Sequence, residues 1–85
     1  MLTPEQKVFV ESKAQEAIAK YGEHIKVYGR LTQGGYSLDK ELYNTPQAEY
    51  FRDIVRAHFQ NLEGFISEIK LNSDGRYLDV RIVPI

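Results

Sequence analysis

Apolar side chains recur at helical spacing in the first quarter of the chain, directly after a Thr-Pro pair. Thr3 and Pro4 suit an N-cap and a first helical residue, and Gly22 suits the left-handed residue that ends many helices. The pattern predicts a helix over residues 4–21. The apolar residues that form its single stripe are Val10, Ala14, Ala17, Ile18 and Tyr21.

A second helix is predicted from Thr45-Pro46 to the neighbourhood of Gly64. Its apolar face consists of Phe51, Ile54, Val55, His58 and Leu62, with Phe59 on the flank. We expect His58 to be buried, hydrogen-bonded and neutral at pH 7, since nearly all buried polar groups have a partner. The alternative is a pH-sensitive or ligand-contacting histidine.

The remaining segments alternate between apolar and polar residues, which is typical of half-buried strands. This alternation predicts strands over residues 24–31, 36–42, 65–71 and 77–83. Turns are expected at Gln33-Gly34-Gly35 and at the hairpin Asn72-Ser73-Asp74-Gly75. The strand at 36–42 has the weakest pattern, and if it is a loop the sheet has three strands.

The predicted fold class is therefore α+β, a two-layer sandwich of order αββαββ in one domain over residues 1–85. Two helices on one face of an antiparallel sheet bury every apolar stripe and strand face. Moving the last strand to the front gives the ferredoxin-like order, so a circularly permuted ferredoxin-like sheet with 77–83 in the centre is expected. The predicted core is Val10, Ala14, Ile18, Phe51, Ile54, Val55, Leu62, Ile69, Val80 and Ile82.

Composition narrows the classes of function. The 85 residues include 11 basic and 12 acidic side chains, two histidines and no cysteine. The absence of cysteine removes disulfides, thiolate catalysis and zinc-finger sites, and it fits a cytoplasmic location. The sequence has no membrane-spanning apolar run and no signal-peptide pattern. We find no nucleophile motif, no metal-ligand cluster and no phosphate-binding loop, so we expect no enzyme activity, no metal and no cofactor.

A small interaction module or regulator that binds a partner protein through its surface is the function we expect. Tyrosine and arginine are frequent in interface hot spots, and Phe9 lies off the stripe of the first helix. The alternative is binding of RNA or single-stranded nucleic acid on the outward sheet face, with Tyr28 and Tyr77 as stacking platforms. The net charge of −1 and the interleaved acids make nucleic acid the less favoured partner. The predicted partner-binding residues are Phe9, Tyr28, Tyr77, Arg30 and Arg81.

Self-association is also expected, because an open sheet has two edges and homodimers are the commonest assemblies. The predicted edges are the strands at 24–31 and 65–71, where charged side chains guard against open-ended pairing. These charged residues are Lys26, Arg30, Glu68 and Lys70.

Overall fold

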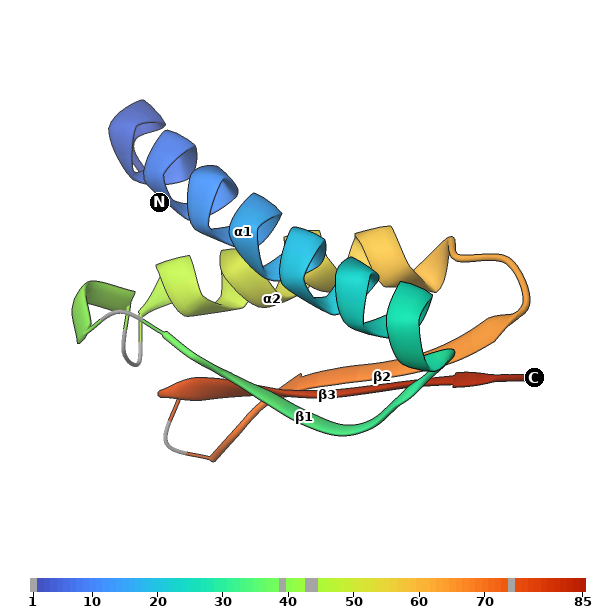
Figure 1. The fold of residues 1–85 in the computed structure, drawn as a ribbon. Helices are drawn as coiled ribbons and strands as arrows, with labels where there is room; N and C mark the ends of the chain where they lie inside the picture. The colour runs from blue at the N-terminus through green and yellow to red at the C-terminus, as the bar shows by residue number, and fades with distance from the viewer. Residues whose placement is uncertain (1, 39, 43–44, 74) are drawn as a thin grey trace.

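The computed structural model describes residues 2–38, 40–42, 45–73 and 75–85. These residues form α1 (Pro4–Tyr28), β1 (Leu31–Ser37), the short 3₁₀ helix η1 (Lys40–Leu42), α2 (Pro46–Gln60), β2 (Phe65–Leu71) and β3 (Tyr77–Pro84). Both helices lie on the same face of the sheet (Figure 1). The predicted α+β class, with two helices on an antiparallel sheet, is confirmed.

The sheet has the order β1-β3-β2, and both pairings are antiparallel. β3 is central, as predicted, and forms a hairpin with β2. In the hairpin turn the Asn72 Oδ1 accepts hydrogen bonds from the backbone N–H groups of Arg76 and Tyr77, at 2.8 and 3.1 Å. The prediction of four strands is wrong for the described residues, which form three. The permuted ferredoxin-like arrangement therefore lacks one of its strands.

The missing strand is the one predicted at 24–31, because α1 continues through Gly22 to Tyr28. Ile25 is buried and extends the stripe of the helix by one more turn. Gly22 has no positive φ and does not end the helix. That role belongs to Gly29, whose φ is 79° and whose N–H donates to the Ile25 carbonyl at 2.6 Å. The N-cap predicted at Thr3 is confirmed, and Thr3 and Gln6 form a capping box there.

β1 begins at Leu31, five residues before the strand predicted at 36–42, and it includes the expected turn at 33–35. Its register with β3 shifts between Leu31 and Gly34, which is a bulge. A Cβ on Gly34 would stand 3.1 Å from a Leu31 side-chain carbon, so this glycine makes room for a core side chain. After β1, Leu38 and Leu42 are buried. Residue 39, within the strand predicted at 36–42, lies outside the described residues.

The buried face of α2 differs from the predicted one, because it includes Phe59 in place of His58. Its buried residues are Ala48, Phe51, Val55 and Phe59. His58 is exposed, so its predicted burial is wrong, and its ring stands edge-on to Phe59 at 4.9 Å. The helix ends at Gln60, and Gly64, with φ 85°, belongs to the turn before β2.

The core lies between the helices and the inward face of the sheet. Eight of the ten predicted core residues are buried, and Ile54 and Leu62 are half-buried against the cluster. Tyr21 and Tyr36 extend it with an edge-to-face ring pair at 6.2 Å, and Tyr36 stacks on Phe51 at 5.4 Å. The predicted edge at 65–71 is confirmed as β2, whereas the other edge is β1 rather than residues 24–31.

Candidate functional site

Phe9, the first of the predicted binding residues, lies near the beginning of α1 and is 38% exposed. The Lys13 Nζ stands 5.8 Å from the centre of the Phe9 ring, within the range of a cation–π contact. A shallow hollow of about 470 Å³ lies beside Phe9, bordered by Glu41 of η1 and Gln47 of α2. Phe9 therefore belongs to the end of the molecule at which both helices begin.

Tyr28 and Arg30 lie where α1 gives way to β1. Tyr28 is on the last turn of the helix, is 69% exposed, and its ring centre is 4.6 Å from that of His24. The prediction that Tyr28 points outward from a strand is wrong, because residues 24–28 are helical. Phe9 and Tyr28 are separated by about 28 Å along α1, at about 1.5 Å per residue. They do not form one binding site.

Tyr77 and Arg81 are the predicted binding residues that share the sheet. Both are exposed on β3, and two alternations of the strand separate them by about 13 Å. Arg81 Nη1 stands 3.4 Å from the Glu68 Oε1 in an exposed ion pair. Because Tyr28 lies on the helix, the sheet does not present the pair of tyrosines that base stacking was expected to use.

The open face of the sheet consists of side chains of β2 and β3 that point away from the helices. It balances its charges across the strands: Glu68 lies opposite Arg81, and Lys70 lies opposite Asp79. A depression of about 230 Å³ beside these residues reaches to Thr32 and Gln33 of β1. Phosphate binding needs an excess of positive charge, which this arrangement does not provide. The open-face residues are Ile66, Glu68, Lys70, Tyr77, Asp79, Arg81 and Val83.

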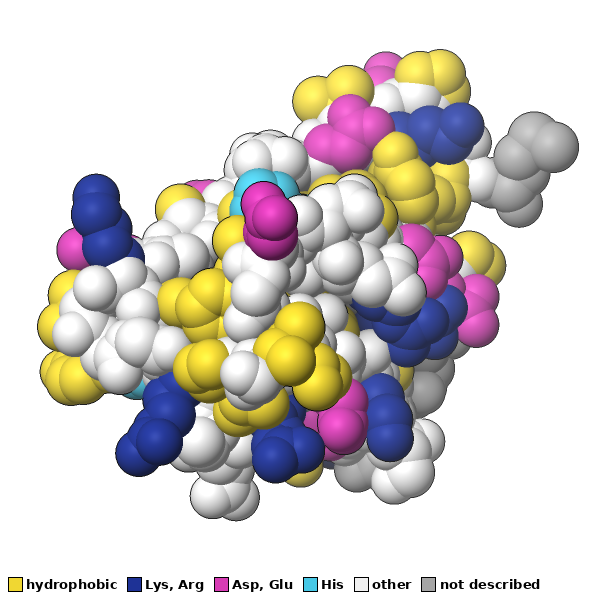
Figure 2. All heavy atoms as spheres, turned by 90° about the vertical axis from the view of Figure 1, so that its right-hand side faces the viewer, with side chains coloured by type: hydrophobic (Ala, Val, Ile, Leu, Met, Phe, Trp, Pro, Cys, Tyr) yellow, Lys and Arg dark blue, Asp and Glu magenta, His cyan; other side chains and the backbone are white. Residues whose placement is uncertain are grey.

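Exposed apolar side chains gather at the end of the molecule where α1 and β3 finish and β2 begins. We call this surface the apolar end. Figure 2 views this end and shows hydrophobic side chains across its middle, with Lys and Arg side chains along its lower border. The Ile85 N–H donates to the Gly64 carbonyl at 3.0 Å, which ties the last residue beside the start of β2. The residues of the apolar end are Val27, Tyr28, Ile66 and Ile85.

Of the apolar end, only Tyr28 was predicted from the sequence to bind. Val27 belongs to the strand predicted at 24–31 and is instead 63% exposed on α1. Ile66 carried a usable signal, because it follows Phe65 directly and two adjacent apolar residues in a strand point to opposite faces. Its 53% exposure on the open face fits that signal.

Two tyrosines have shifted titration. Burial, helped by the nearby Tyr36, raises the pKa of Tyr21 above its ordinary value. The Tyr21 hydroxyl is buried and has no hydrogen-bond partner among the described residues. The Tyr50 hydroxyl donates to the Glu11 Oε2 at 2.6 Å, and this hydrogen bond raises the pKa of Tyr50. The pKa shift of Tyr21 therefore follows from its burial in the core, and that of Tyr50 from its hydrogen bond to Glu11.

The described residues contain no cluster of three or more His, Asp or Glu side chains that could hold a metal ion. Within the same residues no helix is both long and apolar enough to cross a membrane. Comparison of the chain with protein-family models, with curated proteins and with solved structures finds no match. Function is therefore argued from the surface of this molecule.

Proposed function

We propose that the chain is a small non-enzymatic interaction module whose apolar end binds an apolar surface of a partner protein. The observation that carries the proposal is the distribution of exposed apolar side chains. Four of the seven large hydrophobic side chains that are exposed among the described residues belong to this one end. A concentrated apolar patch with a polar border is typical of protein–protein contacts.

Tyr28 is the anchor that this proposal assigns. Its ring is the most exposed aromatic side chain among the described residues, at 69%, and the neighbouring His24 ring supports it from one side. Desolvating such an anchor contributes on the order of 2 kcal/mol to binding. The absence of cysteine supports a cytoplasmic setting, which is part of the proposal.

The test is to capture a partner on the immobilised chain, identify it, and measure its affinity for variants at two ionic strengths. Tyr28→Ala should weaken binding about 30-fold, which corresponds to about 2 kcal/mol. Tyr77→Ala is the matched control, since Tyr77 is an exposed tyrosine at the other end of β3. It should leave affinity within a factor of about three, and salt should have little effect because the contact is apolar.

A different pattern would favour the nucleic-acid alternative. Affinity for an RNA or a single strand that falls steeply with salt indicates phosphate contacts. If Tyr77→Ala and Arg81→Ala then weaken binding while Tyr28→Ala does not, the open face is the binding surface. The ratio of absorbance at 260 and 280 nm of the purified protein gives an early indication of bound nucleic acid.

A further inference from the structure

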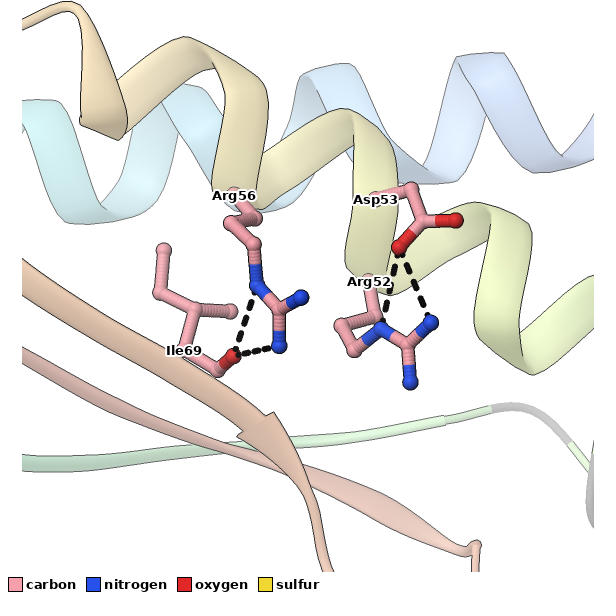
Figure 3. A network of polar contacts seen from close by, with 4 residues as sticks. All are labelled: Arg52, Asp53, Arg56 and Ile69. Atoms are coloured by element: carbon pink, nitrogen blue, oxygen red, sulfur yellow. Dashed lines mark hydrogen bonds and ion pairs between the residues drawn. The ribbon is translucent and has the colours of Figure 1, made fainter.

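The two edges of the sheet differ in how their backbone is covered. At the β2 edge, Arg56 of α2 reaches down and donates from Nε and Nη2 to the Ile69 carbonyl, at 3.2 and 2.8 Å (Figure 3). Arg52, one turn earlier, is paired with Asp53. A strand approaching β2 from outside would need the Ile69 carbonyl, which Arg56 already occupies.

The β1 edge has no comparable cover among the described residues. The segment Leu31–Ser37 contains no charged residue and no proline, which are the usual guards of an exposed edge. No side-chain hydrogen bond among the described residues ends on the backbone of Gly35 or Ser37. The one irregularity of β1 is the bulge between Leu31 and Gly34, which leaves a regular ladder from Gly34 onward.

The direction of the backbone groups follows from the register. The Ile69 carbonyl points away from β3, so the Ile69–Val80 pair is a non-hydrogen-bonded pair. Val80 must then direct its N–H and C=O to Gly34 of β1. By the same alternation, Gly35 and Ser37 direct their backbone groups to the free edge.

We propose that this edge pairs antiparallel with β1 of a second copy of the chain, about a two-fold axis at Gly35. Gly35 meets Gly35 of the other copy there, so no side chains crowd one another on the sheet face at the axis. The segment is neutral, so two copies meet without charge repulsion. Because Arg56 covers the β2 edge, the assembly closes as a six-stranded dimer instead of growing into an open sheet.

This surface is separate from the apolar end, so the dimer does not depend on the proposed partner. The pairing joins the sheets of the two copies with their helices on the same face, because antiparallel strands are related by an axis perpendicular to the sheet. The order of strands is β2-β3-β1 in one copy followed by β1-β3-β2 in the other.

A charge exchange at Gly35 tests the proposal. A Cβ at Gly35 would have ordinary contacts, 3.7 Å to the Leu78 carbonyl oxygen and 3.9 Å to the Tyr77 ring, so a side chain is tolerated in the monomer. Gly35→Lys and Gly35→Glu each place two like charges directly opposite one another across the two-fold axis. Each variant alone should raise the dissociation constant of the dimer roughly tenfold or more, whereas an equimolar mixture should dimerise again.

The control is Ile66→Lys, which adds the same charge to the open face at the other edge and within the apolar end. Sedimentation velocity at high micromolar concentration should show a dimer for the wild type and for Ile66→Lys. Circular dichroism confirms that each variant is folded, and slow amide exchange at Gly35 should accompany dimerisation. A monomeric wild type overturns the proposal. It is equally overturned by a dimer that survives Gly35→Lys and is lost in Ile66→Lys, because the apolar end would then be the contact.

Discussion

At the scale of single residues, two arginines one turn apart on α2 have different partners. Arg56 donates two hydrogen bonds to the Ile69 carbonyl and is partly buried, whereas Arg52 pairs with the exposed Asp53. Hydrogen bonds from a charged donor in a partly buried place contribute more than an exposed ion pair. Arg56 therefore fastens α2 to the edge of the sheet.

Arg56→Ala should lower the free energy of unfolding by about 1–2 kcal/mol, because the Ile69 carbonyl loses its donors. Arg52→Ala is the control and should change it by less than about 0.5 kcal/mol. Urea denaturation followed by circular dichroism measures both values. Equal losses in the two variants would contradict the role of Arg56 at the edge. Because Arg56→Ala also frees the Ile69 carbonyl at the β2 edge, this variant should form larger assemblies than the wild type at high concentration.

Tyr21 differs from Arg56, because its buried hydroxyl makes no hydrogen bond among the described residues. Tyr21→Phe should leave stability unchanged or raise it by about 1 kcal/mol, since the hydroxyl has no partner among the described residues. Tyr50→Phe, which removes the hydroxyl that binds Glu11, should instead lower stability. Thermal unfolding of the two variants beside the wild type distinguishes them. A large loss in Tyr21→Phe would show that the hydroxyl has a partner.

The raised pKa of Tyr21 also gives a dependence on pH. In the folded state Tyr21 keeps its proton to higher pH than in the unfolded chain, where the pKa of tyrosine is about 10. Above that pH the unfolded state binds fewer protons, so stability falls as pH rises. We expect Tyr21→Phe to lose less stability than the wild type between neutral pH and strongly alkaline pH. Parallel pH profiles of denaturant midpoints would contradict this.

At the scale of elements, Gly29 and not Gly22 decides where α1 ends. Gly22 lies within the helix, where an added Cβ would meet no atom within 4 Å, whereas Gly29 has φ 79°. Gly22→Ala should raise the free energy of unfolding by about 0.5–1 kcal/mol, because alanine favours helix. Gly29→Ala should lower it by about 1 kcal/mol or more, because a Cβ is strained at positive φ. If Gly22→Ala destabilises and Gly29→Ala does not, α1 ends at Gly22.

The sequence predicted most elements because their local signals agree with their packing. The capping box at Thr3, the hairpin at Asn72 and the alternation of residues 77–83 all specify the same structure locally and globally. The segment after Gly22 carries two signals, since Ile25 fits both the helical stripe and a strand pattern. Packing of Ile25 on the core selects the helix, and the local sequence pattern does not distinguish helix from strand in this segment. The same holds for residues 33–35, where Gly34, a residue typical of turns, lies in a strand because the Leu31 side chain occupies the space beside it.

The candidate surface was less predictable than the fold, because it depends on elements that meet only in three dimensions. Tyr28 could be chosen for its chemistry, but its neighbours at the apolar end come from α1, β2 and the end of β3. The burial of Phe59 where His58 was predicted to be buried also depends on the three-dimensional packing of α2. The two residues are adjacent on the helix, and the helix turns its larger apolar side chain to the core.

At the scale of the whole molecule, the inward residues of the central strand β3 are buried between the sheet and the helices. Stability in small domains is about 0.05–0.15 kcal/mol per residue, which gives roughly 4–13 kcal/mol for a chain of this length. Val80 is 2% exposed in the central strand, between Gly34 of β1 and Ile69 of β2. One unpaired charge at this position would disrupt the packing of β3 beside both β1 and β2.

Val80→Asp should therefore unfold the domain, because a carboxylate without a partner there costs about 4 kcal/mol or more. Val83→Asp is the matched control: it makes the same change three residues later on the same strand, where the side chain is half-exposed opposite Ile66. It should remain folded with a small loss of stability. Circular dichroism and the cooperativity of thermal melting separate the two outcomes. A soluble Val80→Asp variant that melts cooperatively near the wild-type temperature would contradict the inward register of β3, and with it the placement of the open face on which Ile66 and Arg81 lie.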